Sequence, residues 1–231
     1  MVQTFPISAL THNNYFTTSG HGSRWKVKLK SGDRFPDNYY KESIRAARLL
    51  DSSIDAPLVL LFSGGLDSEY MVNVFIKSGV EFKVAIISYG DYNKHDNKYA
   101  FEFCKKRNIE PIVIDVDIEK FITSGRIIEI ANEAKCCAYQ IPSIMEGILK
   151  VDGAVIMANG EPYVKNFDGD WRWEETERVN SYMNWYKQKN ILGTPDFLRY
   201  TPQMTAGFLL EPRVMKLVNN ELPGKLSTRT S

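Results

Sequence analysis

The segment 58-LVLLFSGGLDSEYM-71 decides the fold, because a continuously apolar run ends abruptly in Ser-Gly-Gly and an acid. A strand covered on both faces of a sheet needs such an unbroken apolar run. Beyond Asp67, the spacing of Met71 and Phe75 is helical, and Gly79 is a stop signal. The segment therefore predicts a buried strand, a loop poor in side chains, and a helix.

The same pattern recurs along the chain. The runs FKVAIIS (82–88), PIVIDVD (111–117) and GAVIMANGEP (153–162) predict three more strands, and NKYAFEFCKKRN (97–108) predicts a helix. Residues 118–150 keep helical periodicity across a break at Pro142. Strands that alternate with helices indicate a parallel sheet with right-handed crossovers. We therefore predict an α/β fold, in which a parallel twisted sheet has helices on both faces.

Three regions follow from changes in composition. Residues 1–38 form an N-terminal attachment with one alternating run, RWKVKLKSG (24–32), which predicts a strand or hairpin arm. Residues 39–170 form the α/β domain. Residues 171–231 contain helical patterns and proline-led helix starts, and we expect a small C-terminal helical extension with a loose tail.

Composition excludes several classes of protein. The formal net charge of the 231 residues is +1, which leaves no broad basic footprint for nucleic acid. No apolar run approaches the roughly 20 residues of a membrane span, so we expect a cytoplasmic protein. The three cysteines are Cys104, Cys136 and Cys137, without a Cys-x-x-Cys pair, so neither a disulfide framework nor a structural zinc site is expected.

The loop after the first buried strand has the chemistry of a phosphate site. Gly64 and Gly65 let backbone N–H groups approach phosphate oxygens, and Ser63 and Ser68 add hydroxyl donors. Asp67 would repel a bare phosphate, so it is expected to bind the magnesium ion that bridges phosphates. The Gly-x-x-x-x-Gly-Lys and Gly-x-Gly-x-x-Gly patterns are absent from this loop. The loop therefore predicts a nucleoside triphosphate with Mg2+, unless it is a glycine turn that merely joins strand to helix.

The motif SGGLDS after an apolar strand resembles the signature of the PP-loop, or N-type, ATP pyrophosphatases, which are adenine nucleotide alpha-hydrolase-like proteins. These include asparagine, GMP and NAD synthetases and several tRNA-modifying enzymes. The resemblance covers about residues 40–165. It implies cleavage of ATP between the α- and β-phosphates: a substrate oxygen attacks the α-phosphorus, pyrophosphate leaves, and a nitrogen or sulfur nucleophile displaces the adenylate.

The resemblance also implies roles for individual residues. Those that would hold the pyrophosphate are Ser63, Gly64, Gly65 and Ser68. Asp67 would bind magnesium and act in catalysis, and Ile87 and Ser88 would flank the adenine of ATP. Gly160 and Glu161 match the start of a Gly-Glu-Gly-Ala-Asp-Glu loop in asparagine synthetase, and we expect them to bind the nucleotide.

The match to that loop then fails, because Val164 and Lys165 stand where it has an acidic pair. Lys165 is a candidate catalytic residue that contacts a phosphate, or alternatively an ordinary exposed lysine. Asp168 or Asp170 is a candidate second metal ligand.

Known members of the family have features that this chain lacks. No glutaminase nucleophile is present, and a 7-cyano-7-deazaguanine synthase would show four zinc cysteines where this chain has three in total. Cys136 or Cys137 is a candidate sulfur carrier, although a cysteine in this context is more often a small buried hydrophobe. Amide or C–N bond formation with ammonia or an amine is the most economical chemistry.

Aromatic residues in 171–186 allow two interpretations. A helix that packs its aromatics against the sheet edge is favoured over stacking on a base or a substrate lid; these aromatics are Trp171, Trp173, Tyr182, Trp185 and Tyr186. Arg172 is the residue of this segment that we expect to contact a ligand. Asp115 and Asp117 follow the third strand and face the same edge of the sheet. Their simplest interpretation is a cap for the next helix.

Our leading hypothesis is an adenylating enzyme of the amidoligase or synthetase type, with ATP, Mg2+ and an unidentified substrate as its ligands. A non-catalytic ATP- or AMP-binding regulatory module is the first alternative, and a tRNA-modifying enzyme is the second. The near-neutral charge disfavours an RNA partner without excluding tRNA. Relatives are often dimers, so a homodimer stays open.

Overall fold

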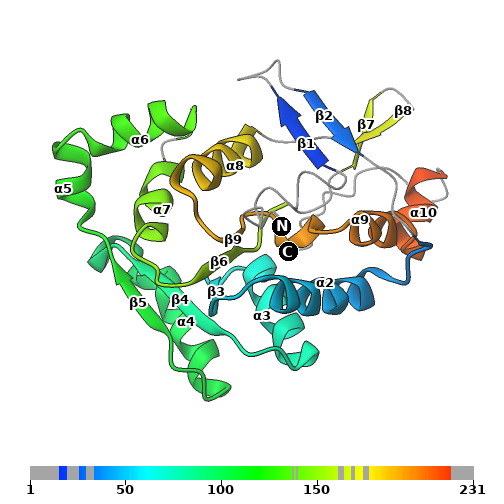
Figure 1. Cartoon of the computed structure of the whole chain (residues 1–231), viewed down its shortest axis with the longest axis horizontal. Coiled ribbons are helices and arrows are strands. Elements are labelled where there is room, and N and C mark those ends of the chain that lie inside the picture. Colours follow the sequence, from blue (N-terminus) through cyan, green and yellow to red (C-terminus); the bar gives the residue numbers. More distant parts are fainter. Residues whose placement is uncertain are drawn as a thin grey trace, which may run out of the picture.

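The centre of the molecule is a five-stranded sheet in which neighbouring strands are all parallel (Figure 1). The computed structural model describes residues 16–19, 26–29, 34–136, 138, 140–160, 164–167, 170–173 and 177–219. The strand order is β5-β4-β3-β6-β9. Their bounds are β3 Leu58–Leu61, β4 Lys83–Ser88, β5 Ile112–Asp115, β6 Ala154–Met157 and β9 Gly193–Thr194. The α/β fold with a parallel sheet is confirmed.

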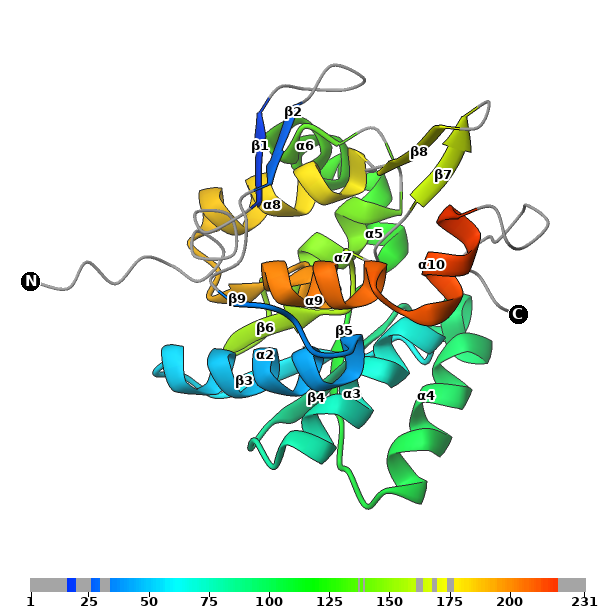
Figure 2. The ribbon, with the colours of Figure 1, turned by 90° about the vertical axis from the view of Figure 1, so that its right-hand side faces the viewer.

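Helices cover both faces of the sheet, as predicted (Figures 1 and 2). On one face lie α2 (Tyr39–Ser53), α3 (Leu66–Ser78) and α4 (Lys94–Lys106). On the other lie α5 (Ile118–Thr123), α6 (Arg126–Ala134), α7 (Ile141–Ile148) and α8 (Glu177–Lys189). Leu58 and Leu60 of β3 join the first core cluster and Val59 joins the other. This alternation explains why β3 is a continuous apolar run, since successive side chains enter opposite cores.

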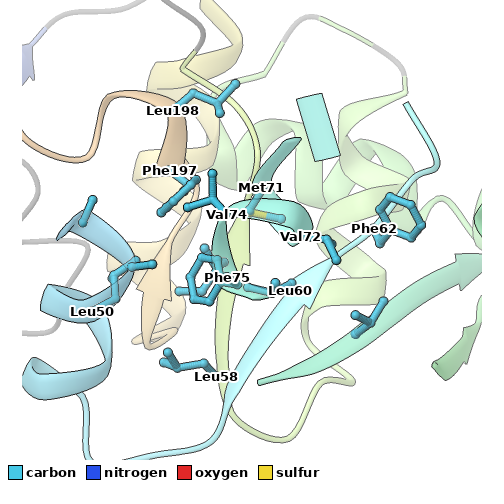
Figure 3. Close-up of a cluster of buried hydrophobic side chains, with 14 of the residues drawn as sticks. Leu50, Leu58, Leu60, Phe62, Met71, Val72, Val74, Phe75, Phe197 and Leu198 are labelled. Carbon is cyan, nitrogen blue, oxygen red and sulfur yellow. The ribbon is translucent and has the colours of Figure 1, made fainter. Parts of the chain in front are cut away.

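The core beneath α2 and α3 is the larger of the two, and Figure 3 shows its centre. Leu60 of β3 lies beside Phe75 of α3, and the Phe75 ring is 5.2 Å from that of Phe197, centroid to centroid. All three side chains are fully buried. Burial of each contributes about 1.5–3 kcal/mol relative to exposure, so this contact holds the strand, the helix and the C-terminal segment together.

The remaining elements surround this sheet. β1 (Phe16–Ser19) and β2 (Lys26–Leu29) pair antiparallel, which confirms the predicted hairpin arm. β7 (Val164–Phe167) and β8 (Asp170–Trp173) form a second antiparallel pair after β6. The shorter elements are the 3-10 turns η2 (Gly90–Asn93) and η3 (Phe197–Arg199), with helices α9 (Pro202–Leu209) and α10 (Pro212–Val218).

Three helix ends carry local capping signals. Asn38 caps α2, since its side chain accepts a hydrogen bond from the N–H of Lys41 at 2.9 Å. Gly79 ends α3 in the left-handed conformation. Thr201 caps α9, and its hydroxyl accepts from the N–H of Met204. Local sequence therefore set these three boundaries.

Two features of the C-terminal part bear on the predicted helical extension. Gly193–Thr194 adds the edge strand β9, and Phe197 and Met204 are buried in the same core cluster as β3. Residues 170 and 171, where we divided the chain, both lie in β8. The proposed division into three regions stays a prediction. No helix of the described residues is long and apolar enough to cross a membrane.

Candidate functional site

The chain reverses direction across the sheet between β3 and β6. From β3 the chain steps outward to β4 and β5, and it then returns to place β6 on the opposite side of β3. Leu61 is in register with Met157, so the loops that follow these strands leave the sheet side by side. In open α/β sheets, ligands bind outside the carboxyl ends of strands at such a switch point. The predicted phosphate loop, Ser63–Gly65, is one of these two loops.

Gly64 fits the loop because a side chain there would be both strained and crowded. Its φ is +81°, in the left-handed region that glycine tolerates best. A Cβ on Gly64 would lie 3.2 Å from the backbone nitrogen of Ala100 and 3.4 Å from the carbonyl oxygen of Asp96. The loop therefore rests directly on the backbone of α4, which leaves its opposite side for a ligand.

Gly65 is the N-cap residue of α3 and supplies no side-chain capping bond. The first N–H groups of a helix have no intrahelical acceptor, and the helix dipole places partial positive charge there. An anion can take the place of the missing cap. This arrangement fits the predicted phosphate site.

The two serines of the motif shape the loop. Ser68 is buried, and its hydroxyl donates to the carbonyl of Gly65 at 2.9 Å. Because a hydroxyl has one hydrogen, Ser63 is the donor in the 3.2 Å bond between the two hydroxyls. The hydroxyl of Ser63 also lies 3.4 Å from the nitrogen of Gly65 as its acceptor. Ser63 is exposed, so it is the serine that a ligand reaches more easily.

Asp67 lies in the first turn of α3 with an exposed side chain. Within the described ranges, no group of three or more His, Cys, Asp or Glu side chains is placed to hold a metal ion. Magnesium needs no such group, because it keeps several waters and binds through one or two carboxylates together with substrate phosphates. A single carboxylate beside the loop fits a magnesium ion carried by a nucleotide.

The loop after β6 is held by the C-terminal segment. The carbonyl of Asn159 accepts from the N–H of Leu198 at 3.1 Å, and its side-chain amide donates to the carbonyl of Pro195. Gly160 has a φ of +82°, and a Cβ there would lie 2.8 Å from Cγ of Arg199. Gly160 is buried at the switch point, and Glu161 lies outside the described residues.

Asp196 and Arg199 are two buried charged residues that the sequence analysis missed. Their side chains are 1% and 2% exposed, and their closest charged atoms are 3.5 Å apart. Asp and Arg are almost never this deeply buried unless they are paired. The pair lies against Gly160 and so supports the second loop of the switch point. Sequence alone gave no signal, because a single Asp-x-x-Arg spacing is common.

The end of β4 forms the third side of the candidate site. Ile87 is nearly buried and packs against Gly147 of α7. Ser88 is partly buried, and its hydroxyl accepts from the N–H of Gly90 at 3.3 Å. Both residues are therefore at the carboxyl end of the strand beside the phosphate loop, where we predicted the adenine. Their contact with a base stays a prediction.

The turn after Ser88 is fixed by three side chains that the sequence analysis did not single out. Asn93 and Asn97 both donate to the carbonyl of Ile87, at 2.9 and 3.2 Å. The hydroxyl of Tyr89 donates to Ser143 of α7 at 2.9 Å, and burial raises the pKa of Tyr89. The signal was weak, because asparagines near a helix start are usually read as caps.

Lys165 lies on β7, where it is in register with Arg172 of β8. The two basic residues that we predicted to contact ligand are therefore opposite each other in one hairpin. The predicted roles of both residues stay untested. Asp170 is the first residue of β8, and Asp168 lies outside the described residues.

Other candidate residues have structural roles. Tyr182, Trp185 and Tyr186 are buried in the core under α8, which confirms the packing interpretation for these three. Asp117 caps α5 by accepting from the N–H of Lys120 at 2.9 Å. Cys136 is partly buried at the edge of the same core, and Cys137 lies outside the described residues.

Comparison with known proteins gives a family model that matches part of the chain and similar solved structures, including two synthetases. The model of the family "Queuosine biosynthesis protein QueC" matches residues 57–143, from the start of β3 into α7. NMN synthetase from Francisella tularensis has a TM-score of 0.39 and 15% identity, over 81% of this chain and 98% of that chain. NH3-dependent NAD synthetase from Campylobacter jejuni also has a TM-score of 0.39 and 15% identity, over 82% and 100%. No curated protein sequence matches significantly.

The QueC match begins just before β3 and includes the whole Ser-Gly-Gly loop with the helix that follows it. This region contains β3, β4 and β5, the strands on one side of the switch point, and ends before β6. The motif, its place in the parallel sheet and the family match agree. Residues 57–143, which contain the Ser-Gly-Gly motif, match the QueC family, and this confirms the predicted resemblance to the adenine nucleotide alpha-hydrolase-like superfamily, the PP-loop ATP pyrophosphatases.

Proposed function

We propose that the protein cleaves ATP to AMP and pyrophosphate and thereby activates an oxygen of a substrate for attack by ammonia, an amine or another nucleophile. The observation that carries this proposal is the loop Ser63–Gly65 at the switch point, which rests on α4 and ends at the uncapped N-terminus of α3. Such a loop favours binding of the β- and γ-phosphates, which leave together as pyrophosphate.

Different groups of the loop would bind the phosphates and the magnesium ion. The N–H groups at the start of α3 would hold the phosphate oxygens and stabilise charge on the leaving group, and the hydroxyl of Ser63 would turn from Ser68 to donate to them. Asp67 would hold magnesium, which supplies positive charge for the phosphates when it is bound. A substrate oxygen that attacks the α-phosphorus displaces pyrophosphate and leaves the substrate as its adenylate. A nucleophile then displaces AMP.

Two features bear on the substrate. The family that matches residues 57–143 is named for queuosine biosynthesis, which favours a biosynthetic enzyme. A 7-cyano-7-deazaguanine synthase would need four zinc cysteines, and the chain has three, none of them after residue 137. We therefore propose a small-molecule acid or amide as the substrate, in the cytoplasm, and leave its identity to experiment.

Asp67→Asn tests the catalytic assignment. The carboxylate is exposed at the first turn of α3, so the amide should leave the fold intact and remove the magnesium ligand. AMP and pyrophosphate are measured after incubation of Mg-ATP with the protein and a small-molecule extract. We expect the wild type to release both in equal amounts and the variant to fall by about 100-fold or more. Equal release by the two proteins would contradict the role of Asp67.

The matched control is Asp51→Asn, which changes an exposed carboxylate on α2. It should leave turnover unchanged. If the wild type binds ATP but releases no AMP with small-molecule or RNA extracts, the regulatory module is the better reading of the loop.

A further inference from the structure

Helix α4 touches both halves of the candidate nucleotide site. Its residues Asp96 and Ala100 lie under Gly64 of the phosphate loop, within 3.4 Å of the position of a Cβ. Between them in the sequence, Asn97 points its amide at the carbonyl of Ile87, at the end of β4. One turn of this helix therefore contacts the loop expected to hold phosphates and the strand end expected to meet the base.

The contact with β4 is made by a pair of side-chain amides. Asn93 and Asn97 both donate to the carbonyl oxygen of Ile87, and they also donate to each other at 3.3 and 3.2 Å. The side-chain oxygen of Asn93 accepts in addition from the N–H of Tyr89 at 2.8 Å. A carbonyl oxygen has two lone pairs, so the two amides fill its capacity.

The amide pair makes the strand end rigid. Asn97 is 7% exposed, and buried hydrogen bonds of this kind are stronger than those in water. Loss of one amide would leave a carbonyl at the strand end short of a donor and would release the turn Ser88–Asn93. Because α4 also supports Gly64, the amide pair fixes the strand end relative to the phosphate loop.

We propose that Asn93 and Asn97 are positioning residues for the nucleoside half of the bound nucleotide, acting through Ile87 and Ser88. This inference rests on the proposed function, since it assumes that a nucleoside triphosphate occupies the switch point. It goes beyond the motif because neither asparagine belongs to the Ser-Gly-Gly loop.

The experiment separates the two halves of the site. Binding of Mg-ATP and of Mg-tripolyphosphate, which has no nucleoside, is measured by titration calorimetry on the full chain. For Asn97→Ala we expect ATP to bind about tenfold more weakly, while tripolyphosphate binds as it does to the wild type. If Asn97 has a purely structural role, the variant should bind both ligands more weakly. If Asn97 has no role, the affinity for each ligand should stay as in the wild type. Either of these results would overturn the proposal.

A second variant and a control guard against a general loss of structure. Asn93→Ala removes the other member of the pair and should show the same split between the ligands. Asn73→Ala removes the acceptor of the 3.1 Å bond from Arg107, a different link between α3 and α4, and should affect neither ligand. If Asn73→Ala weakens ATP as much as Asn97→Ala does, docking of α4 rather than the amide pair positions the nucleoside.

The wild type separates this inference from the proposed function. If it binds neither Mg-ATP nor Mg-tripolyphosphate, the proposed function fails as well. If it binds both with equal affinity, the nucleoside contributes nothing and the positioning role fails while a phosphate site stands.

Discussion

At the scale of single residues, the two glycines that flank α3 share a backbone conformation but differ in how closely other atoms approach them. Gly64 and Gly79 have φ values of +81° and +74°, so both occupy the left-handed region. A Cβ on Gly64 would meet the backbone of α4, whereas a Cβ on Gly79 would meet nothing within 4 Å. Substitution of Gly79 therefore tests backbone strain alone, whereas substitution of Gly64 tests strain together with crowding against α4.

We predict that Gly64→Ala destabilises the fold by about 1–3 kcal/mol, since strain and crowding add, and that it abolishes detectable binding of Mg-ATP. Gly79→Ala should lower the free energy of unfolding by about 1 kcal/mol, from backbone strain alone, and leave the binding of Mg-ATP unchanged. Urea denaturation and calorimetry of both variants check this. Wild-type affinity in a folded Gly64→Ala protein would show that the loop does not approach the phosphates.

At the scale of elements, α2 is fastened by a carboxylate that is almost completely buried. Glu42 is 1% exposed, and it accepts from Arg34, from Arg45 at 2.7 Å and from the N–H of Asp37 at 2.7 Å. Burial by itself raises the pKa of Glu42, but the bonds from Arg34 and Asp37 outweigh it and hold the pKa below its usual value. The charged form is therefore the one that stabilises the N-terminus of α2.

This shift predicts a pH dependence. Because the pKa of Glu42 is lower in the folded state, its contribution is complete above the ordinary glutamate pKa and is lost as pH falls through the folded value. Glu42→Gln should lower the free energy of unfolding by about 2 kcal/mol at pH 7. The difference in unfolding free energy between variant and wild type should narrow as pH falls below about 4. Urea denaturation at several pH values measures this difference.

Glu129→Gln is the matched control at this scale. Glu129 pairs with Arg126 at 2.9 Å, but its side chain is 61% exposed. Surface pairs of this kind contribute roughly 0–1 kcal/mol, so the change should be small at every pH. If the difference in unfolding free energy between Glu42→Gln and wild type does not change with pH, the assigned charge state of Glu42 is contradicted.

At the scale of the whole molecule, the C-terminal segment completes the sheet. Gly193 begins β9 with a φ of +105°, and a Cβ there would lie 2.1 Å from the carbonyl oxygen of Val155 on β6. No side chain fits this gap without movement of the strand. The segment that follows carries Phe197 into the main core and Asp196 and Arg199 under Gly160.

We predict that Gly193→Ala costs about 3 kcal/mol or more, since backbone strain and overpacking act together, and that it weakens Mg-ATP binding by loosening the loop after β6. Denaturation midpoints and ATP titrations test both effects. Gly125→Ala, at a left-handed glycine with nothing within 4 Å, is the control for strain alone. If Gly193→Ala matches that control, residues 171–231 form an extension that is independent of the sheet.

Part of the fold was determined by the sequence itself. The apolar runs of β3, β4 and β6, the cap at Asn38 and the stop at Gly79 are local signals, because each depends on residues within one turn or one strand. The Ser-Gly-Gly loop was recognised for the same reason. A compact motif carries its chemistry in consecutive positions.

The tertiary structure decided the rest, because it depends on contacts between distant residues. The two-residue strand β9 has no periodicity to detect, and Trp171 and Trp173 lie on β8 rather than in a helix. The burial of Arg199, the amide pair on Ile87 and the contact of Gly64 with α4 each join segments that only the folded chain brings together. The sequence by itself determined the phosphate loop and the strands that present it; only the tertiary structure decided which side chains hold that loop in place.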